Sequence, residues 1–204
     1  MTADTCGLCE APFGGDGHDR VGGVALCRRC FLGDVTRVVK ARGWTLWSEH
    51  YQYSVRELED NMRYVTKVRI TAGESALEML CRRATPWQRL LGLVRSRARS
   101  QDPLFEGHVR VWTPRPRPVE EFLRGDGVES CVMEVLGNLL SSAVSVRGGT
   151  IEIHYAADDP HTEGEVVARA CVLAHHLGRL AVEPRPTEVE AIQGSVYGAP
   201  RRSE

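Results

Sequence analysis

Cys6-Gly7-Leu8-Cys9, followed seventeen residues later by Cys27-Arg28-Arg29-Cys30, decides the fold of the first part of this 204-residue chain. The two-residue gap within each pair lets two thiolates bind one ion from a single tight turn, and two such pairs supply the corners of a tetrahedron. The spacing therefore predicts one structural zinc ion. Four thiolates leave no coordination position for water, so we do not expect a catalytic zinc. The predicted ligands are Cys6, Cys9, Cys27 and Cys30.

Two alternatives exist for these residues. A Cys-x-x-Cys pair is also the form of a redox dithiol, but redox motifs normally stand alone after a strand, whereas a second pair follows here. His18 is an alternative fourth ligand, although its loop is rich in Gly and Asp, which favours a solvated side chain. The other cysteines, Cys81, Cys131 and Cys171, lie within apolar segments and are predicted to be small buried hydrophobic residues.

The residues around the second pair predict how the site is built. From Arg28 to Arg42 apolar residues recur at helical spacing, and Gly43 stands where a helix normally stops. Cys30 is therefore expected in the first helical turn, where amide N–H groups and the helix dipole favour thiolate over thiol. A β-hairpin with permissive turns is expected between the pairs, because that stretch contains Gly14, Gly15, Gly17, Gly22 and Gly23.

A knuckle, a hairpin and a helix carrying the last two ligands resemble a treble-clef or zinc-ribbon finger. The C-x2-C-x17-C-x2-C spacing is similar to that of GATA-type fingers, with Leu26-Cys27-Arg28-Arg29-Cys30 in the place of that family's second pair. The resemblance covers residues 6 to about 42 and implies the metal geometry. It does not imply DNA reading, because the hairpin lacks the Thr-Pro-Leu-Trp-Arg-Arg run with which that family supports its DNA contacts.

The rest of the chain predicts an α+β fold: after a zinc-binding finger at 1–43, a domain at 44–183 with a mixed or antiparallel sheet and amphipathic helices packed on it, and a disordered tail at 184–204. Apolar alternation predicts the strands, and 3.6-residue periodicity predicts the helices. Strands are expected at 44–53, 62–70, 77–81, 108–113 and 150–155, with a short helix as the alternative at 77–81. Helices are expected at 128–145, at 162–182 and at 85–95, the last with an apolar stripe of Trp87, Leu90, Leu91 and Val94.

Residues 62–182 resemble a group of bacterial domains of unknown function. In that group an Asp-Pro-x-Phe segment leads into a strand and an Arg-x-Gly turn leads into a late strand; Asp102-Pro103-Leu104-Phe105 and Arg147-Gly148-Gly149 stand at these places here. The motifs are structural, so the resemblance implies a fold and no activity.

Charge is unevenly distributed, although the net charge is −1 at pH 7. Residues 63–124 hold 13 basic and 6 acidic side chains, which gives +7, and residues 125–190 hold 4 and 11, which gives −7. This pattern fits a basic face for an acidic partner, complementary patches used in self-association, or two segments that interleave in one fold. We expect interleaving.

No familiar catalytic motif occurs in the sequence, and we expect no enzyme. His175 and His176 would point about 100° apart on a helix, so we expect a surface pair rather than a metal site. No apolar run approaches the ~20 residues that span a bilayer, and no charged and apolar leader begins the chain. We therefore expect a soluble protein without a membrane partner. Its thiolate ligands and its unpaired cysteines favour the reducing cytoplasm.

Two functions follow from these features. The first is a zinc-binding protein-interaction or scaffold module whose partner is another protein. The alternative is nucleic-acid binding, in which basic side chains neutralise phosphates. Against the alternative, residues 1–43 carry six basic and five acidic side chains, and exposed aromatics interleaved with basic residues are scarce along the sequence. Its candidate contacts are Arg28, Arg29, Arg37, Lys40 and Arg42 on the finger helix, and Arg82, Arg83, Arg89, Arg95, Arg97 and Arg99 in the acid-free segment 82–99.

Overall fold

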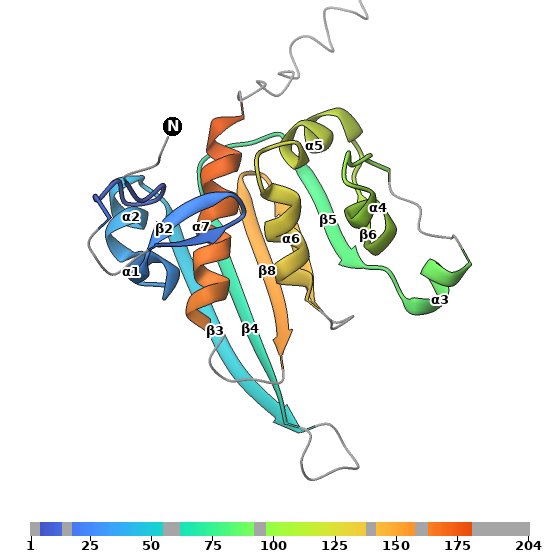
Figure 1. The fold of residues 1–204 in the computed structure, drawn as a ribbon, viewed down its shortest axis with the longest axis horizontal. Coiled ribbons are helices and arrows are strands. Elements are labelled where there is room, and N and C mark those ends of the chain that lie inside the picture. The colour runs from blue at the N-terminus through green and yellow to red at the C-terminus, as the bar shows by residue number, and fades with distance from the viewer. Residues whose placement is uncertain are drawn as a thin grey trace, which may run out of the picture.

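The computed structural model describes residues 5–13, 18–54, 62–91, 97–137, 142–157 and 163–180. A two-stranded hairpin near the N-terminus is followed by a six-stranded sheet, and helices cover one face of that sheet (Figure 1). Every strand pair is antiparallel, so the predicted α+β class is confirmed. The tail predicted at 184–204 lies outside the described residues.

The described residues 5–13 and 18–43 form what we call the cysteine module. Strands β1 (His18–Val21) and β2 (Val24–Cys27) pair through a turn at Gly22 and Gly23, whose φ angles of 52° and 75° suit a two-residue hairpin. Helix α1 (Arg28–Phe31) and helix α2 (Thr36–Ala41) follow. The single helix predicted over Arg28–Arg42 is therefore wrong, because Gly33 adopts a φ of 85° and breaks it. The predicted stop is confirmed, since Gly43 follows the end of α2 with a φ of 65°.

The large sheet has the strand order β3-β4-β8-β7-β5-β6. Strands β7 and β8 belong to the acidic segment of the sequence but lie between β4 and β5, which belong to the basic segment. The two segments thus interleave, and ion pairs join them: Arg69 lies 3.0 Å from Glu152, and Arg147 lies 3.5 Å from Glu78. The strands are β3 (Thr45–Ser54), β4 (Met62–Thr71), β5 (Glu78–Arg83), β6 (Val109–Trp112), β7 (Ala143–Arg147) and β8 (Thr150–Ala157).

Five helices accompany these strands in the described part of the chain: α3 (Pro86–Leu90), α4 (Pro103–His108), α5 (Pro116–Leu123), α6 (Val128–Leu136) and α7 (Glu163–Arg179). The helix predicted over 128–145 is half wrong. It stops at Leu136 because Gly137 adopts φ 49° and ψ −143°, a conformation open to glycine, and residues from Ala143 form strand β7 instead. None of the described helices is both long and apolar enough to cross a bilayer.

Helix α3 begins as predicted. The Gln88 N–H donates to the Thr85 Oγ1 at 3.2 Å, and the Thr85 N–H donates to the Gln88 Oε1 at 3.1 Å. Its apolar stripe is not packed, however: the exposed fractions of Trp87, Leu90 and Leu91 are 71%, 75% and 61%. Val94 lies outside the described residues.

The core lies between the sheet and helices α6 and α7, which cross one face of it (Figure 1). Val68, Ile70, Ile151 and Ile153 point from the sheet into this layer and are fully buried. Helix α7 packs on the sheet on one side and contacts the cysteine module on another. The surface pair predicted at His175 and His176 is therefore wrong, because helix α7 has partners on both sides and His176 is buried.

Candidate metal centre

The first cysteine pair sits in a tight knuckle. The Cys6 N–H donates to the Ala11 carbonyl at 2.8 Å, and the Glu10 N–H donates to the Cys6 carbonyl at 2.9 Å. Glu10 adopts a φ of 61°, which turns the chain back immediately after Cys9. The Gly7 N–H donates to the Ala25 carbonyl at 2.8 Å and thereby ties the knuckle to strand β2. The first pair is thus held by backbone hydrogen bonds against the hairpin that carries the second.

The second pair spans the junction of hairpin and helix. Cys27 ends β2 and is the N-cap residue of α1, and Cys30 lies in that helix, as predicted. Cys6 and Cys30 are buried, whereas Cys9 and Cys27 are half-buried. The hairpin therefore brings two sulfurs to the outer side of the cluster and two to its inner side.

The four sulfur atoms fit a tetrahedral ion. All lie within 4.8 Å of one another, and the Sγ atoms of Cys9 and Cys27 are 3.7 Å apart. A metal–sulfur bond of about 2.3 Å in a tetrahedron requires sulfur separations of about 3.8 Å. All four are free thiols. The four thiols are therefore close enough together to hold one metal ion.

The thiols of the cluster differ in acidity. Burial raises the pKa of the Cys6 thiol, but hydrogen bonds from the backbone N–H groups of Cys9, Cys27 and Leu8 outweigh it and lower that pKa to about 7. Burial raises the pKa of Cys9. Burial, reinforced by the negative charge of Cys6, raises the pKa of Cys30 strongly. Several buried sulfurs cannot carry negative charge together without a cation, so the site suits a metal that supplies one.

Arg42 joins the end of α2 to the knuckle. Its guanidinium donates to the Leu8 carbonyl at 3.4 Å, lies 3.7 Å from the Glu10 carboxylate and stacks over the Trp44 ring at 5.3 Å. A groove of about 570 Å³ opens beside the cysteines between the knuckle and α2. Arg29, Arg37 and Arg42 line it, but Arg29 is paired with Asp34 at 2.6 Å.

The cysteine module docks on the rest of the fold through glycines. A Cβ atom on Gly22, in the hairpin turn, would lie 2.7 Å from Cys131 of α6 and 2.9 Å from the Gly127 carbonyl. Real side chains do not approach so closely, so the turn must have no side chain here. Val21, Leu26 and Val35 belong to the same apolar cluster as α7. The boundary predicted at residue 43 separates two regions that share one core, and their independence stays a prediction.

The structure does not gather the candidate nucleic-acid contacts on one face. The arginines and lysine of α1 and α2 lie at the β3 end of the sheet, whereas Arg89 of α3 lies at the opposite end (Figure 1). Arg82 and Arg83 are neighbours in β5, so their side chains point to opposite faces. Arg97 and Arg99 lie in the segment before α4, and Arg95 lies outside the described residues.

The other cysteines are buried, as predicted. Burial raises the pKa of Cys81 and of Cys171 to about 12, and it also raises the pKa of Cys131. The His18 side chain, the alternative ligand, lies outside the described part of the structure.

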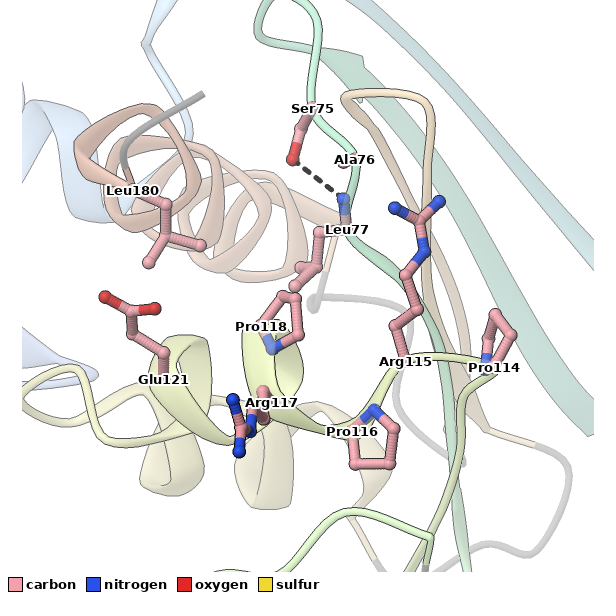
Figure 2. Close-up of a pocket in the computed structure, with 10 residues that line it drawn as sticks. All are labelled: Ser75, Ala76, Leu77, Pro114, Arg115, Pro116, Arg117, Pro118, Glu121 and Leu180. Carbon is pink, nitrogen blue, oxygen red and sulfur yellow. Dashed lines mark hydrogen bonds between the residues drawn. The ribbon is translucent and has the colours of Figure 1, made fainter. Parts of the chain in front are cut away.

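A larger cavity of about 870 Å³ shares no lining residue with the groove beside the cysteines (Figure 2). Its walls come from residues 75–77, from the proline-rich turn at 114–118 that starts α5, and from Leu180 after α7. Glu121, Arg115 and Arg117 are its only ionisable lining residues among those described, and neither cysteine nor histidine lines it. Ser75 supplies a hydroxyl to the wall, and its Oγ accepts a hydrogen bond from the Leu77 N–H at 3.1 Å.

Searches with family models, against curated proteins and against solved structures gave no match to this chain. The resemblance to GATA-type fingers therefore rests on the cysteine spacing alone and stays a prediction.

Proposed function

We propose that Cys6, Cys9, Cys27 and Cys30 bind one structural zinc ion and that the chain is a protein-interaction module. The observation that carries the zinc assignment is the sulfur geometry, with Cys9 and Cys27 Sγ atoms 3.7 Å apart. An all-thiolate tetrahedral set favours zinc over calcium or magnesium, which prefer oxygen ligands. Four protein ligands also close the coordination sphere, as in structural rather than catalytic zinc sites. Free thiol ligands suit a reducing compartment such as the cytoplasm.

The partner proposal rests on helix α3. Trp87, Leu90 and Leu91 present three large apolar side chains to solvent on a helix that a capping box fixes at its start. Ordered apolar side chains that gather on a surface are typical of contact sites for other proteins. The cysteine module lies at the other end of the sheet, so zinc would stabilise the scaffold without taking part in the contact (Figure 1).

Metal analysis of the purified protein tests the first half of the proposal. We expect one equivalent of zinc per chain, and a loss of that zinc when Cys27→Ser and Cys30→Ser are combined. Less than about half an equivalent in the wild type, or full occupancy in the double variant, contradicts the assignment.

Site-specific crosslinking tests the second half. A photo-reactive side chain at position 90 of α3 should give one defined protein adduct in cells, and Trp87→Ser in the same chain should abolish it. The control carries the same group at position 37, on the exposed side of α2. Equal adducts from both positions, or none from position 90, would exclude α3 as the contact surface.

A further inference from the structure

The six-stranded sheet has one face that helices α6 and α7 leave uncovered, which we call the open face. Along β4 and β8, side chains alternate between the buried core and this face. Val68, Ile70, Ile151 and Ile153 are fully buried in the core. On the other side, the exposed fractions are 49% for Trp47, 54% for Arg69 and 47% for Glu152. The open face therefore meets solvent at these positions of β3, β4 and β8.

Strand register arranges the open face in rows perpendicular to the strands. Trp47 of β3 and Trp112 of β6, the two edge strands, stand on the same row. The complete row reads Trp47, Arg69, Glu152, Ser145, Leu80 and Trp112. The next row on the same face reads Glu49, Lys67, His154, Ala143, Arg82 and Arg110.

We call Lys67, His154, Arg82 and Arg110 the basic row. It extends from β4 to β6, which is four strand spacings or about 19 Å. That length accommodates several nucleotides of an extended strand.

Cations and aromatic rings are interleaved on this face. The Arg69 guanidinium lies 5.8 Å from the centre of the Trp47 ring, and the Arg110 guanidinium lies 4.7 Å from that of Trp112. The Lys67 ammonium lies 5.2 Å from the centre of the Tyr51 ring. Each contact holds a ring beside a positive charge. Aromatic rings and cations thus lie side by side at both edges of the sheet.

The basic row keeps an excess of positive charge. Arg69 and Arg147 on the open face are neutralised by Glu152 and Glu78. Glu49 stands opposite Lys67 in the strand register, but among the described residues no carboxylate lies within 4.0 Å of the charged nitrogens of Lys67, Arg82 or Arg110. Burial lowers the pKa of His154, and the charge of Lys67 lowers it further, while the charge of Glu152 partly opposes this effect. A ligand with regularly spaced negative charges would complement this row.

We propose that the open face binds single-stranded nucleic acid, with phosphates along the basic row and bases stacked on Trp47 and Trp112. An acidic protein would match the charge but would leave no role for indole rings at both ends of one row. A duplex would match the phosphates but keeps its bases inside, so an unpaired strand uses both features. None of these side chains belongs to the zinc cluster or to helix α3.

The experiment measures the anisotropy of fluorescent 15-nucleotide DNA and RNA strands against the zinc-loaded protein. We expect binding that weakens steeply with salt, as phosphate contacts require. Arg82→Ala should weaken it and lower the salt slope by about 1, and Trp47→Ala should weaken it about 5-fold or more. Trp47→Phe should restore most of the loss, because phenyl rings also stack on bases.

Matched controls lie elsewhere on the molecule. Arg37→Ala removes an exposed arginine of α2, and Trp87→Ala removes an exposed tryptophan of α3. Neither should change binding. Zinc content and circular dichroism verify that each variant is folded.

Three results would overturn the proposal. They are no binding of either strand at low salt, equal weakening by Arg37→Ala and Arg82→Ala, and binding that Trp47→Ala leaves unchanged. If poly-glutamate displaced the labelled oligonucleotide as effectively as unlabelled nucleic acid does, the open face would be a site for acidic proteins instead.

Discussion

Gly33, between α1 and α2, lies directly against Gly164 in the first turn of α7. A Cβ atom on Gly33 would be 2.6 Å from the Gly164 Cα, and a Cβ atom on Gly164 would collide with the Leu32 carbonyl. Backbone therefore packs on backbone where the cysteine module meets the longest helix of the described chain. This contact and the one at Gly22 fix how the module sits on the core.

We expect Gly164→Ala to destabilise the zinc-loaded protein by about 1–3 kcal/mol, because the added methyl group must push the module away from α7. Urea denaturation measures the change. Gly178 provides the control within the same helix, since a Cβ atom there would meet nothing within 4 Å. Gly178→Ala should be neutral or stabilise by up to about 1 kcal/mol, because alanine favours helix. If the two variants behaved alike, the Gly33–Gly164 contact would not hold the module in place.

Local patterns predicted much of the fold and the metal site. The cysteine spacing alone located the four thiols that the structure brings within 4.8 Å. Alternation located β3, β4, β6 and β8, because one side of each lies against the core while the other faces outward. Where one side of an element is buried, its period is visible in the sequence.

The failures have a common physical cause. Val144 continues the helical period of α6, yet it pairs with Ile153 of β8 and Cys81 of β5, so long-range pairing decided its structure. Gly33 interrupts a helical pattern because the chain must fit against Gly164. The interleaved cations and rings of the open face were missed because Trp47 meets Arg69 across strands, and no window of sequence contains both.

Removing the metal should melt the cysteine module and leave the sheet folded. We expect a chelator to abolish the module's structure. The module has little apolar core of its own, so its folding depends on zinc binding, which contributes on the order of 10 kcal/mol. The core retains its own sheet and helices, although α7 loses the cover of Val21, Leu26 and Val35. Far-ultraviolet circular dichroism should therefore retain its strand signal while a hydrophobic dye begins to bind. Loss of all secondary structure would show that the module and the core fold as one unit.

Metal affinity should fall steeply as pH falls. The raised pKa values of Cys9 and Cys30 keep both sulfurs protonated at neutral pH without metal, so binding must release at least two protons. Each released proton makes the apparent affinity about 10-fold weaker per unit of falling pH, which gives about 100-fold for two. Below about pH 7 the Cys6 thiol also becomes protonated and steepens the loss. Competition with a coloured chelator at pH 6, 7 and 8 measures this slope. A flat profile would exclude thiolate ligands.

Helix α6 offers a contrast between two residues two positions apart. Leu136 is 1% exposed, so Leu136→Ala should cost about 2–5 kcal/mol through lost transfer free energy and a cavity. From the sequence, Glu134 on the opposite face should tolerate alanine within about ±0.5 kcal/mol. The structure adds a partner: the Arg169 Nε donates to the Glu134 carboxylate at 3.0 Å.

Arg169 also donates to the Glu165 carboxylate at 3.1 Å. Loss of the Glu134 carboxylate therefore still leaves the half-buried Arg169 cation one carboxylate partner. We therefore raise the expected cost of Glu134→Ala to about 0.5–1 kcal/mol, still well below that of Leu136→Ala. Urea denaturation of both variants with zinc bound decides between them. Two neutral variants would mean that α6 is not packed in the core. Equal and large costs would mean that Glu165 alone does not compensate the charge of Arg169. In that case Glu134→Gln, which retains an acceptor oxygen for Arg169, should recover part of the lost stability.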